Sequence, residues 1–262
     1  MDSKHLLSTP EDGSYMMSVS DIMSGLMFVF IITLAIFIIN FQIASKEHED
    51  KVKNLEAILS ELEGNNAMRA SMLIRVQSML AQMEVDVTID EEHGVLRLDE
   101  QAVRFDTGSD RLSDQQRQRL MVVGGVLAEI LPCYAAIQPD NKHCLPETKG
   151  KLDSVFIEGH TDNVPIRGRL AQRFKDNWAL SAVRSVYTYR NLVLTSDRLS
   201  GMLNVNQQPI FSVSGYGEGR PVPGHEHTKP TNDPENRRID FRFIMTPPSV
   251  TETQAALDGN FQ

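Results

Sequence analysis

The chain opens with a long uncharged apolar run, and its later apolar residues recur at helical or strand intervals. From Ile22 to Ile39, 18 residues carry no charge, enough for about 27 Å of helix at ~1.5 Å per residue. Because a bilayer's hydrocarbon core is about 30 Å thick, we expect one transmembrane helix over 21–42. The acidic residues before the run and the weak cleavage site after it favour an uncleaved anchor over a signal peptide.

Residues 43–84 show helical patterns that predict a stalk. Four apolar residues lie at spacings of three, four and three on an otherwise charged helix, namely Val52, Leu55, Leu59 and Leu62. The Gly-Asn-Asn at 64–66 predicts an interruption. A second apolar face follows it, at Met68, Met72, Val76, Met79 and Met83. We expect a stalk of two helical pieces whose narrow seam needs a partner; the alternative is an amphipathic helix that lies on its own domain.

Beyond Glu84 the apolar period changes from about 3.6 to 2, which indicates strands. Two alternating segments around EEHG predict a hairpin over 85–99. Ser113, three residues before Gln116, has the spacing of a capping box and opens a helix. Residues 132–151 read as a loop. Further on, the pattern predicts a strand, a helix and two more strands, at 152–160, 177–194, 209–217 and 237–245. The order indicates an α+β domain, and the last 15 or so residues show no periodic pattern.

Composition and charge narrow the possible functions. The chain has 35 acidic and 26 basic residues, a net charge of −9, and no clustered basic face, so we expect no nucleic-acid partner. Nucleophile and P-loop motifs are absent from the sequence, and an enzyme is not expected. His225 and His227 have ligand-like spacing, but no further ligand is visible in their loop. We therefore expect no metal and no cofactor apart from a transported ion.

Four motifs in the second half carry a specific resemblance. They are IEGHTDNVPI at 157–166, NWALSAVR at 177–184, GYGEGRPV at 215–222 and NRRIDF at 236–241. Their order and spacing resemble the OmpA-like peptidoglycan-binding domain, in the branch of the flagellar stator B subunit, MotB. The resemblance implies an α/β sandwich over 85–246, outside the cytoplasmic membrane, with a C-terminal tail at 247–262.

A wall-binding site needs two opposite charges close together. Diaminopimelate presents an ammonium and a carboxylate on one carbon, so its receptor needs an anionic acceptor and a forked cationic donor. Asp162 and Arg184 supply these groups. The resemblance implies that Asn177, Leu180 and Arg237 shape the pocket. The alternatives are that Asp162 only forms a turn after a strand and that Arg184 is a solvated helix residue.

Asp21 stands at the start of the apolar run, where a carboxylate is costly. In the stator family the matching Asp takes up and releases the permeating ion, here expected to be H⁺, because protonation removes the charge and its desolvation cost. The alternative is a helix N-cap. The stretch SDIMSGLMFVFIITLAIF resembles the B subunit of the Zorya anti-phage defence system, ZorB, more than the flagellar form, since the tail at 1–20 is acidic.

The resemblance implies partners and a location. We expect a multi-span A subunit of the MotA or ZorA type, a second copy of this chain, and peptidoglycan. The N-terminus would be cytoplasmic and the remainder periplasmic, although the lysines at 46, 51 and 53 follow the span and give no support from the positive-inside rule. An external location predicts a disulfide between Cys133 and Cys144; the alternative is two reduced cysteines. A flagellar stator subunit and a passive cell-wall tether are the rival functions.

Overall fold

The structure, a computed structural model, describes residues 12–98, 103, 105, 109–138, 144–168, 170–194 and 196–248, with side chains from Val19 onward. It is α+β, as the sequence predicts. The chain divides into two compact units, one up to Leu59 and one from Ser60. The predicted C-terminal tail lies almost entirely outside the described residues.

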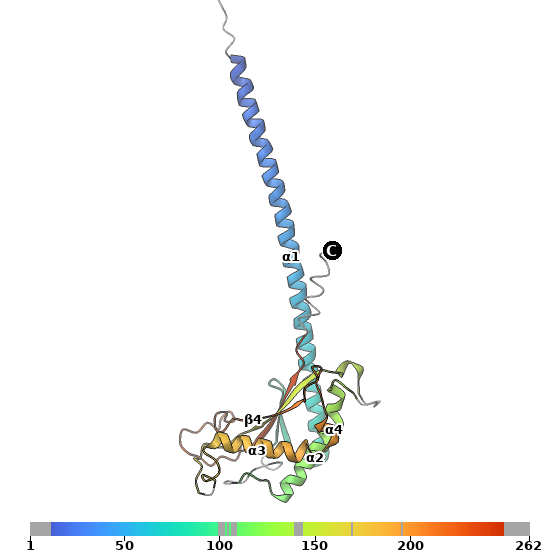
Figure 1. The fold of residues 1–262 in the computed structure, drawn as a ribbon, viewed down its shortest axis with the longest axis vertical. Helices are drawn as coiled ribbons and strands as arrows, with labels where there is room; N and C mark the ends of the chain where they lie inside the picture. Colours follow the sequence, from blue (N-terminus) through green and yellow to red (C-terminus); the bar gives the residue numbers. More distant parts are fainter. Residues whose placement is uncertain are drawn as a thin grey trace, which may run out of the picture. The chain divides into compact units, whose positions relative to one another are not determined.

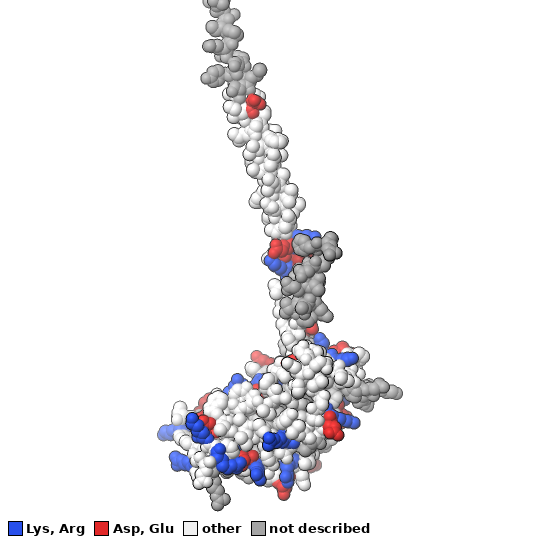
Figure 2. Space-filling model, in the orientation of Figure 1, with Lys and Arg blue, Asp and Glu red and all other residues white. Residues whose placement is uncertain are grey.

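The first unit consists of helix α1 (Asp12–Gln82) as far as Leu59. One helix in the described chain is long and apolar enough to cross a membrane, and none of its most apolar window is buried. Figure 2 shows this part of α1 as an uncharged surface between acidic and mixed charges. The seam residues Val52, Leu55 and Leu59 are exposed along it.

Helix α1 continues without a break through residues 64–66, so the predicted interruption is wrong. Gly64 has open space around it, and the amide of Asn65 donates a hydrogen bond to the carbonyl of Thr246 at 3.0 Å. Glycine inside a helix costs about 1 kcal/mol relative to alanine. A tertiary hydrogen bond from a residue that is 5% exposed offsets such a cost, and the helix is maintained.

The last turns of α1 belong to the core of the second unit. Met72, Leu73, Val76 and Leu80 are fully buried, and Gln77 donates to the carbonyl of Val87 at 3.0 Å. The predicted boundary between stalk and domain at 84 therefore lies too far along the chain, since the compact unit begins at Ser60. For this piece, the structure shows the alternative of an amphipathic helix packed on its own domain.

A five-stranded sheet forms the centre of the second unit (Figure 1). Its strands are β1 (Val87–Asp90), β2 (Val95–Leu98), β3 (Leu152–Gly159), β4 (Phe211–Gly215) and β5 (Ile239–Met245). Their order is β1-β2-β5-β3-β4, and all neighbours are antiparallel except β3 and β4. The predicted hairpin is therefore confirmed as β1 and β2. The parallel pair needs a crossover, and this crossover contains a helix.

Helix α2 (Asp114–Ile130) starts at the predicted capping box, in which Ser113 and Gln116 exchange hydrogen bonds. Helix α3 (Asn177–Leu192) lies between β3 and β4 in the chain and packs on both strands and on α2 (Figure 1). Helix α4 (Asp197–Ser200) was not predicted. The expected loop at 132–151 includes most of one short 3-10 helix, Leu131–Tyr134, and all of a second, Pro146–Thr148.

Two glycines allow α3 to lie directly on the sheet. Gly159 and Gly215 are register partners at the ends of β3 and β4. A Cβ on Gly159 would lie 2.2 Å from the carbonyl oxygen of Ser181, and one on Gly215 would lie 2.5 Å from the backbone nitrogen of Ala182. Because only glycine permits this approach, the sequence of the strand ends fixes where α3 lies.

Candidate functional site

The five residues predicted for the wall site come together around one cavity of about 200 Å³. Asp162 follows β3, Arg237 precedes β5, and three more lining residues lie on α3: Asn177, Leu180 and Arg184. The position of α3 on the glycines therefore also sets the cavity. These residues are separated by up to 75 positions in the chain, so their convergence is a property of the fold.

Asp162 forms a buried ion pair. Its Oδ2 accepts a hydrogen bond from Nη1 of Arg237 at 2.8 Å, and both side chains are 8% exposed. Its Oδ1 accepts from the backbone N–H of Val164 at 3.2 Å, which is the turn interaction considered as the alternative for this residue. Asp162 thus makes the turn and also presents a charge to the cavity. Arg237 donates in addition to Oδ1 of Asn232.

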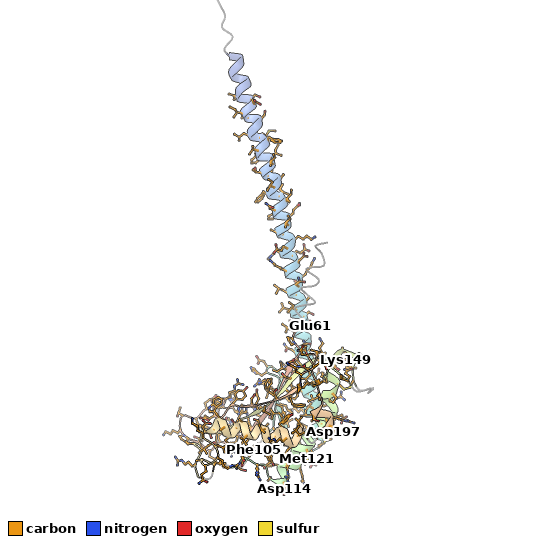
Figure 3. All side chains as sticks on the ribbon, viewed as in Figure 1. Glu61, Phe105, Asp114, Met121, Lys149 and Asp197 are labelled. Atoms are coloured by element: carbon orange, nitrogen blue, oxygen red, sulfur yellow. A yellow bond between two sulfur atoms is a disulfide. The ribbon has the colours of Figure 1, made fainter. Side chains whose placement is uncertain are left out.

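Arg184 is buried, so the alternative of a solvated helix residue is wrong. It is 2% exposed, and both Nε and Nη2 donate to the carbonyl of Ser109, at 3.0 and 2.7 Å. Its guanidinium lies 4.9 Å from the centre of the Phe105 ring, which Figure 3 labels beside α3. These contacts hold the guanidinium at the cavity in a fixed orientation.

The N-terminus of α3 supports the cavity wall. Asp176 caps the helix by accepting from the N–H of Ala179 at 2.9 Å. The next residue, Asn177, donates from its amide to the carbonyls of Asp162 and Val164, at 3.3 and 3.1 Å. Leu180 packs with Leu170 and Phe174 in a small apolar cluster. The wall of the cavity therefore combines a hydrogen-bonded backbone with apolar surface.

Among the lining residues that were not singled out from the sequence, Thr161 and Arg167 have polar side chains. Thr161 is 4% exposed, and its Oγ1 has no hydrogen-bond partner among the described residues. Arg167 is exposed at the cavity and adds a third guanidinium to its lining, after those of Arg184 and Arg237. Thr161 lies inside the first motif, between His160 and Asp162, and was within reach of the sequence argument; Arg167 had no such signal.

His160 does not line the cavity and lies among charged side chains. Neither ring nitrogen makes a hydrogen bond in the described structure, Nε2 lies 3.6 Å from Asp240, and the ring stacks on Tyr216. Its backbone N–H donates a hydrogen bond to the carbonyl of Arg238 at 3.0 Å. Burial, assisted by the positive charge of Arg238, lowers the pKa of His160 to about 3. Asp240 is already paired with Arg97 and Arg238.

The histidines of the loop between β4 and β5 also have an unpredicted neighbour. Asp233 accepts hydrogen bonds from both His225 and His227. Burial alone would raise the pKa of Asp233. The hydrogen bonds from the two histidines and from the N–H of Glu235 together outweigh burial, so the pKa lies below its usual value.

Part of the chain is similar to a curated protein of known name. Over 100 residues the chain is 31% identical to Motility protein B of Bacillus subtilis (strain 168), a match that covers 38% of this chain and 33% of that protein. The chain is similar to Motility protein B. It spans about a third of the length of this curated relative. No family model matches the chain.

Two solved structures are also similar. One is described as a MotB-like protein from Desulfovibrio vulgaris, with 20% identity, a TM-score of 0.44, and coverage of 73% of this chain and 98% of that one. The other is the cell wall anchor of the T6SS from Pseudomonas aeruginosa, with 19% identity, a TM-score of 0.42, and coverage of 66% and 97%.

Asp21 does not cap α1. The helix begins at Asp12, nine positions earlier, so the first-turn N–H groups that an N-cap would satisfy are far from this carboxylate. The capping alternative is therefore wrong.

The two cysteines, Cys133 and Cys144, are joined by a disulfide, as the sequence predicts. The bond links the first 3-10 helix to the segment before the second.

Proposed function

We propose that this chain is the B subunit of a proton-driven motor in the cell inner membrane and that its sheet domain holds the motor to peptidoglycan. The observation that carries the anchoring role is the convergence of Asp162, Arg184 and Arg237 on one cavity. A carboxylate beside forked cations suits a ligand with an ammonium and a carboxylate on one carbon. The similarity to Motility protein B supports the same role.

The geometry refines how such a ligand would bind. Because Asp162 is already paired with Arg237, a ligand ammonium would join an existing ion pair. The ligand carboxylate would meet Arg184, which the carbonyl of Ser109 holds in place. Exposed Arg167 stands at the cavity and can attract the wall peptide before it enters.

Sacculus binding by the full chain in detergent tests the anchoring role. Asp162→Asn keeps an oxygen for the turn but removes the charge, and Arg184→Lys keeps the charge but removes the fork. Each should cost on the order of 2 kcal/mol, or about 30-fold in affinity. Arg190→Ala is the control, since Arg190 is exposed on α3 and does not line the cavity. Undiminished binding by both folded site variants would place the site elsewhere.

The motor role rests on Asp21, a carboxylate nine residues inside a helix whose following surface is apolar. A helix of this kind needs a partner that faces the carboxylate, and we propose a multi-span A subunit of the MotA or ZorA type. The exposed seam at Val52, Leu55 and Leu59 suits pairing with a second copy of this chain. The N-terminus would be cytoplasmic and the sheet domain periplasmic.

Asp21→Asn and Asp21→Glu separate the motor from a passive tether. Asn keeps the size of the side chain but cannot exchange a proton, whereas Glu can. We expect Asn to abolish activity without loss of co-purification with the A subunit, and Glu to retain part of it. Full activity of the Asn variant would leave the passive tether as the better account.

We propose the Zorya defence system as the setting, on the basis of the resemblance of the membrane stretch and the acidity of the tail before it. The flagellar stator is the alternative, and it is favoured by the similarity to Motility protein B. A helicase or nuclease gene beside the gene of the A subunit would support defence. Expression of both subunits should then confer phage resistance, whereas restored swimming of a stator-deficient strain would support the flagellar role.

A further inference from the structure

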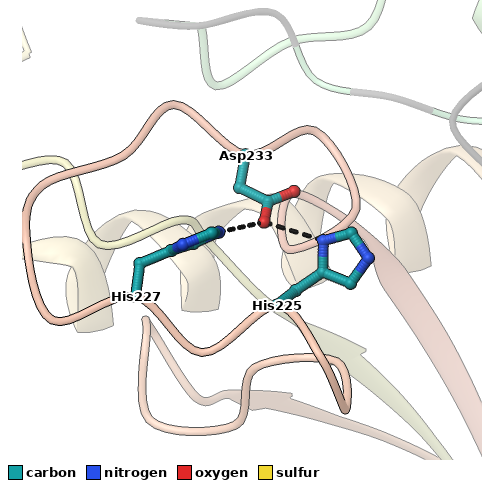
Figure 4. A group of neighbouring side chains, drawn as sticks. All are labelled: His225, His227 and Asp233. Carbon is teal, nitrogen blue, oxygen red and sulfur yellow. Dashed lines mark hydrogen bonds and ion pairs between the residues drawn. The ribbon is translucent and has the colours of Figure 1, made fainter.

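The loop between β4 and β5 gathers two imidazoles and a carboxylate around one point (Figure 4). Oδ2 of Asp233 lies 2.9 Å from Nδ1 of His225 and 2.6 Å from Nε2 of His227. All three potential ligand atoms lie within 4.8 Å of one another. In Figure 4 the two rings approach the same carboxylate oxygen from opposite sides.

We propose that His225, His227 and Asp233 form a binding site for a divalent transition-metal ion, with Zn²⁺ as the best match. Two imidazole nitrogens and one carboxylate oxygen form a ligand set typical of zinc, whereas Ca²⁺ and Mg²⁺ prefer oxygen ligands. Water would complete a four-coordinate site. In a tetrahedral zinc site the ligand atoms are about 3.3 Å apart, given bonds of ~2.0 Å. The two separations from Oδ2 of Asp233, 2.9 and 2.6 Å, lie within about 0.7 Å of that spacing.

The backbone around the three ligands is already fixed, which lowers the cost of forming the site. Oδ1 of Asp233 accepts from the N–H of Glu235 at 3.0 Å, leaving Oδ2 directed at the histidines. The amide of Asn236 donates to the carbonyl of His225 at 2.9 Å. The amide of Asn163 donates to the carbonyl of His227 at 2.7 Å. Such outer contacts orient ligands and strengthen metal binding.

Exposure also suits a metal site with an open position. The side chain of Asp233 is 6% exposed, whereas those of His225 and His227 are 40% and 32% exposed. The carboxylate thus lies on the buried side of the site. The rings face a cavity that has Glu218 and Thr228 among its lining residues. A metal ion can enter from this side and retain a water ligand.

The pair of His93 and Asp90 provides a matched control. Nδ1 of His93 lies 2.9 Å from Oδ2 of Asp90, the same separation as between His225 and Asp233. Both side chains are exposed, and no second histidine is grouped with this pair among the described residues. If a histidine–aspartate hydrogen bond were enough to bind Zn²⁺, substitution of His93 and of His225 would weaken zinc binding equally. A metal site in the loop predicts that only substitution of His225 or His227 weakens it.

Equilibrium competition between the full-length chain and a chromophoric zinc chelator tests the proposal. For this experiment the protein is prepared without a histidine tag, freed of bound metal with EDTA and kept in detergent. We expect one high-affinity Zn²⁺ per chain. His225→Ala and His227→Ala should each weaken this binding by at least about 100-fold, since even loss of an outer partner costs 10- to 100-fold. His93→Ala should bind like the wild type.

A second measurement keeps the test independent of variant folding. Stoichiometric Zn²⁺ should raise the melting temperature of the wild type and of His93→Ala, because it binds the folded state. Zn²⁺ should leave the melting temperature of Asp233→Asn unchanged. In this variant the side chain keeps its size and an oxygen that can accept from the N–H of Glu235. Equal zinc binding by the wild type, His225→Ala and His227→Ala, or no stoichiometric binding by the wild type, would overturn the proposal.

Discussion

Substitution of Gly159 by alanine should test whether α3 is positioned by its contact with the sheet. The new Cβ would lie 2.2 Å from the carbonyl oxygen of Ser181 and 2.5 Å from Oγ of Ser185. Ordinary contact begins at 3.4 Å, so the carbonyl must withdraw by about 1.2 Å. The helix cannot yield freely, because Ser185 also donates to the carbonyl of Ser214 on β4 at 2.6 Å.

The expected destabilisation is about 3 kcal/mol. Overpacking of a closely packed interior costs about 1–3 kcal/mol, and weakening of the hydrogen bond from Ser185 adds about 1 kcal/mol. A domain of 150–250 residues loses about 2–4 °C per kcal/mol, so the melting temperature should fall by about 6–12 °C. Because α3 also carries Asn177 and Leu180, sacculus binding should weaken in the same variant.

Gly125→Ala is the matched control. Gly125 is an exposed residue in the interior of α2, and a Cβ added there would meet nothing within 4 Å, so alanine should stabilise the helix by about 1 kcal/mol. Thermal unfolding followed by the fluorescence of Trp178 suits the experiment, since this single tryptophan lies at the start of α3. A Gly159→Ala variant that melts at or above the temperature of Gly125→Ala would refute the packing argument.

Three further predictions follow from other parts of the sheet domain. Unreduced, unfolded protein should show no reactive thiols, and replacing Cys133 and Cys144 together by serine should cost about 3 kcal/mol of unfolding free energy; labelling of both cysteines would contradict the disulfide. The folded chain protonates His160 only near pH 3 and the unfolded chain near pH 6.5, so stability should fall by about 3 kcal/mol from this group between pH 7 and pH 4, and His160→Gln should show a flatter pH profile of melting temperature. Asn65→Ala should cost about 1–3 kcal/mol through the unpaired carbonyl of Thr246, measured by thermal unfolding, and an unchanged melting temperature would exclude that contact.

Local signals in the sequence were sufficient for several elements. The capping box of Ser113 and Gln116 marks the start of α2 because both partners lie within one helical turn. The period-2 pattern on either side of the turn at 91–94 likewise predicts the hairpin of β1 and β2, because the two paired strands are close together in the sequence.

Contacts between distant residues were not accessible in this way. The continuity of α1 at Asn65 depends on the carbonyl of Thr246, 181 positions away. The orientation of Arg184 depends on the carbonyl of Ser109, 75 positions away. The resemblance to the OmpA-like domain assigned Arg184 to the binding site, but it could not show which backbone group holds the side chain. Likewise, the spacing of His225 and His227 suggested ligands, whereas Asp233 becomes visible as their partner only when the loop is folded.

Two adjacent residues in the segment that follows β3 connect the cavity with the loop of the proposed metal site. Asp162 pairs with Arg237 at the cavity, whereas Asn163 holds the carbonyls of His227 and Lys229 in the loop. Arg237 also donates to Asn232, which directly precedes Asp233. Hydrogen bonds therefore connect the wall-binding cavity with the loop that carries His225, His227 and Asp233. If Zn²⁺ changes the affinity for peptidoglycan through this network, then by linkage peptidoglycan must change the affinity for Zn²⁺ by the same factor. A factor that differs from one and is the same in both directions would show coupling, whereas a factor of one would show two independent sites.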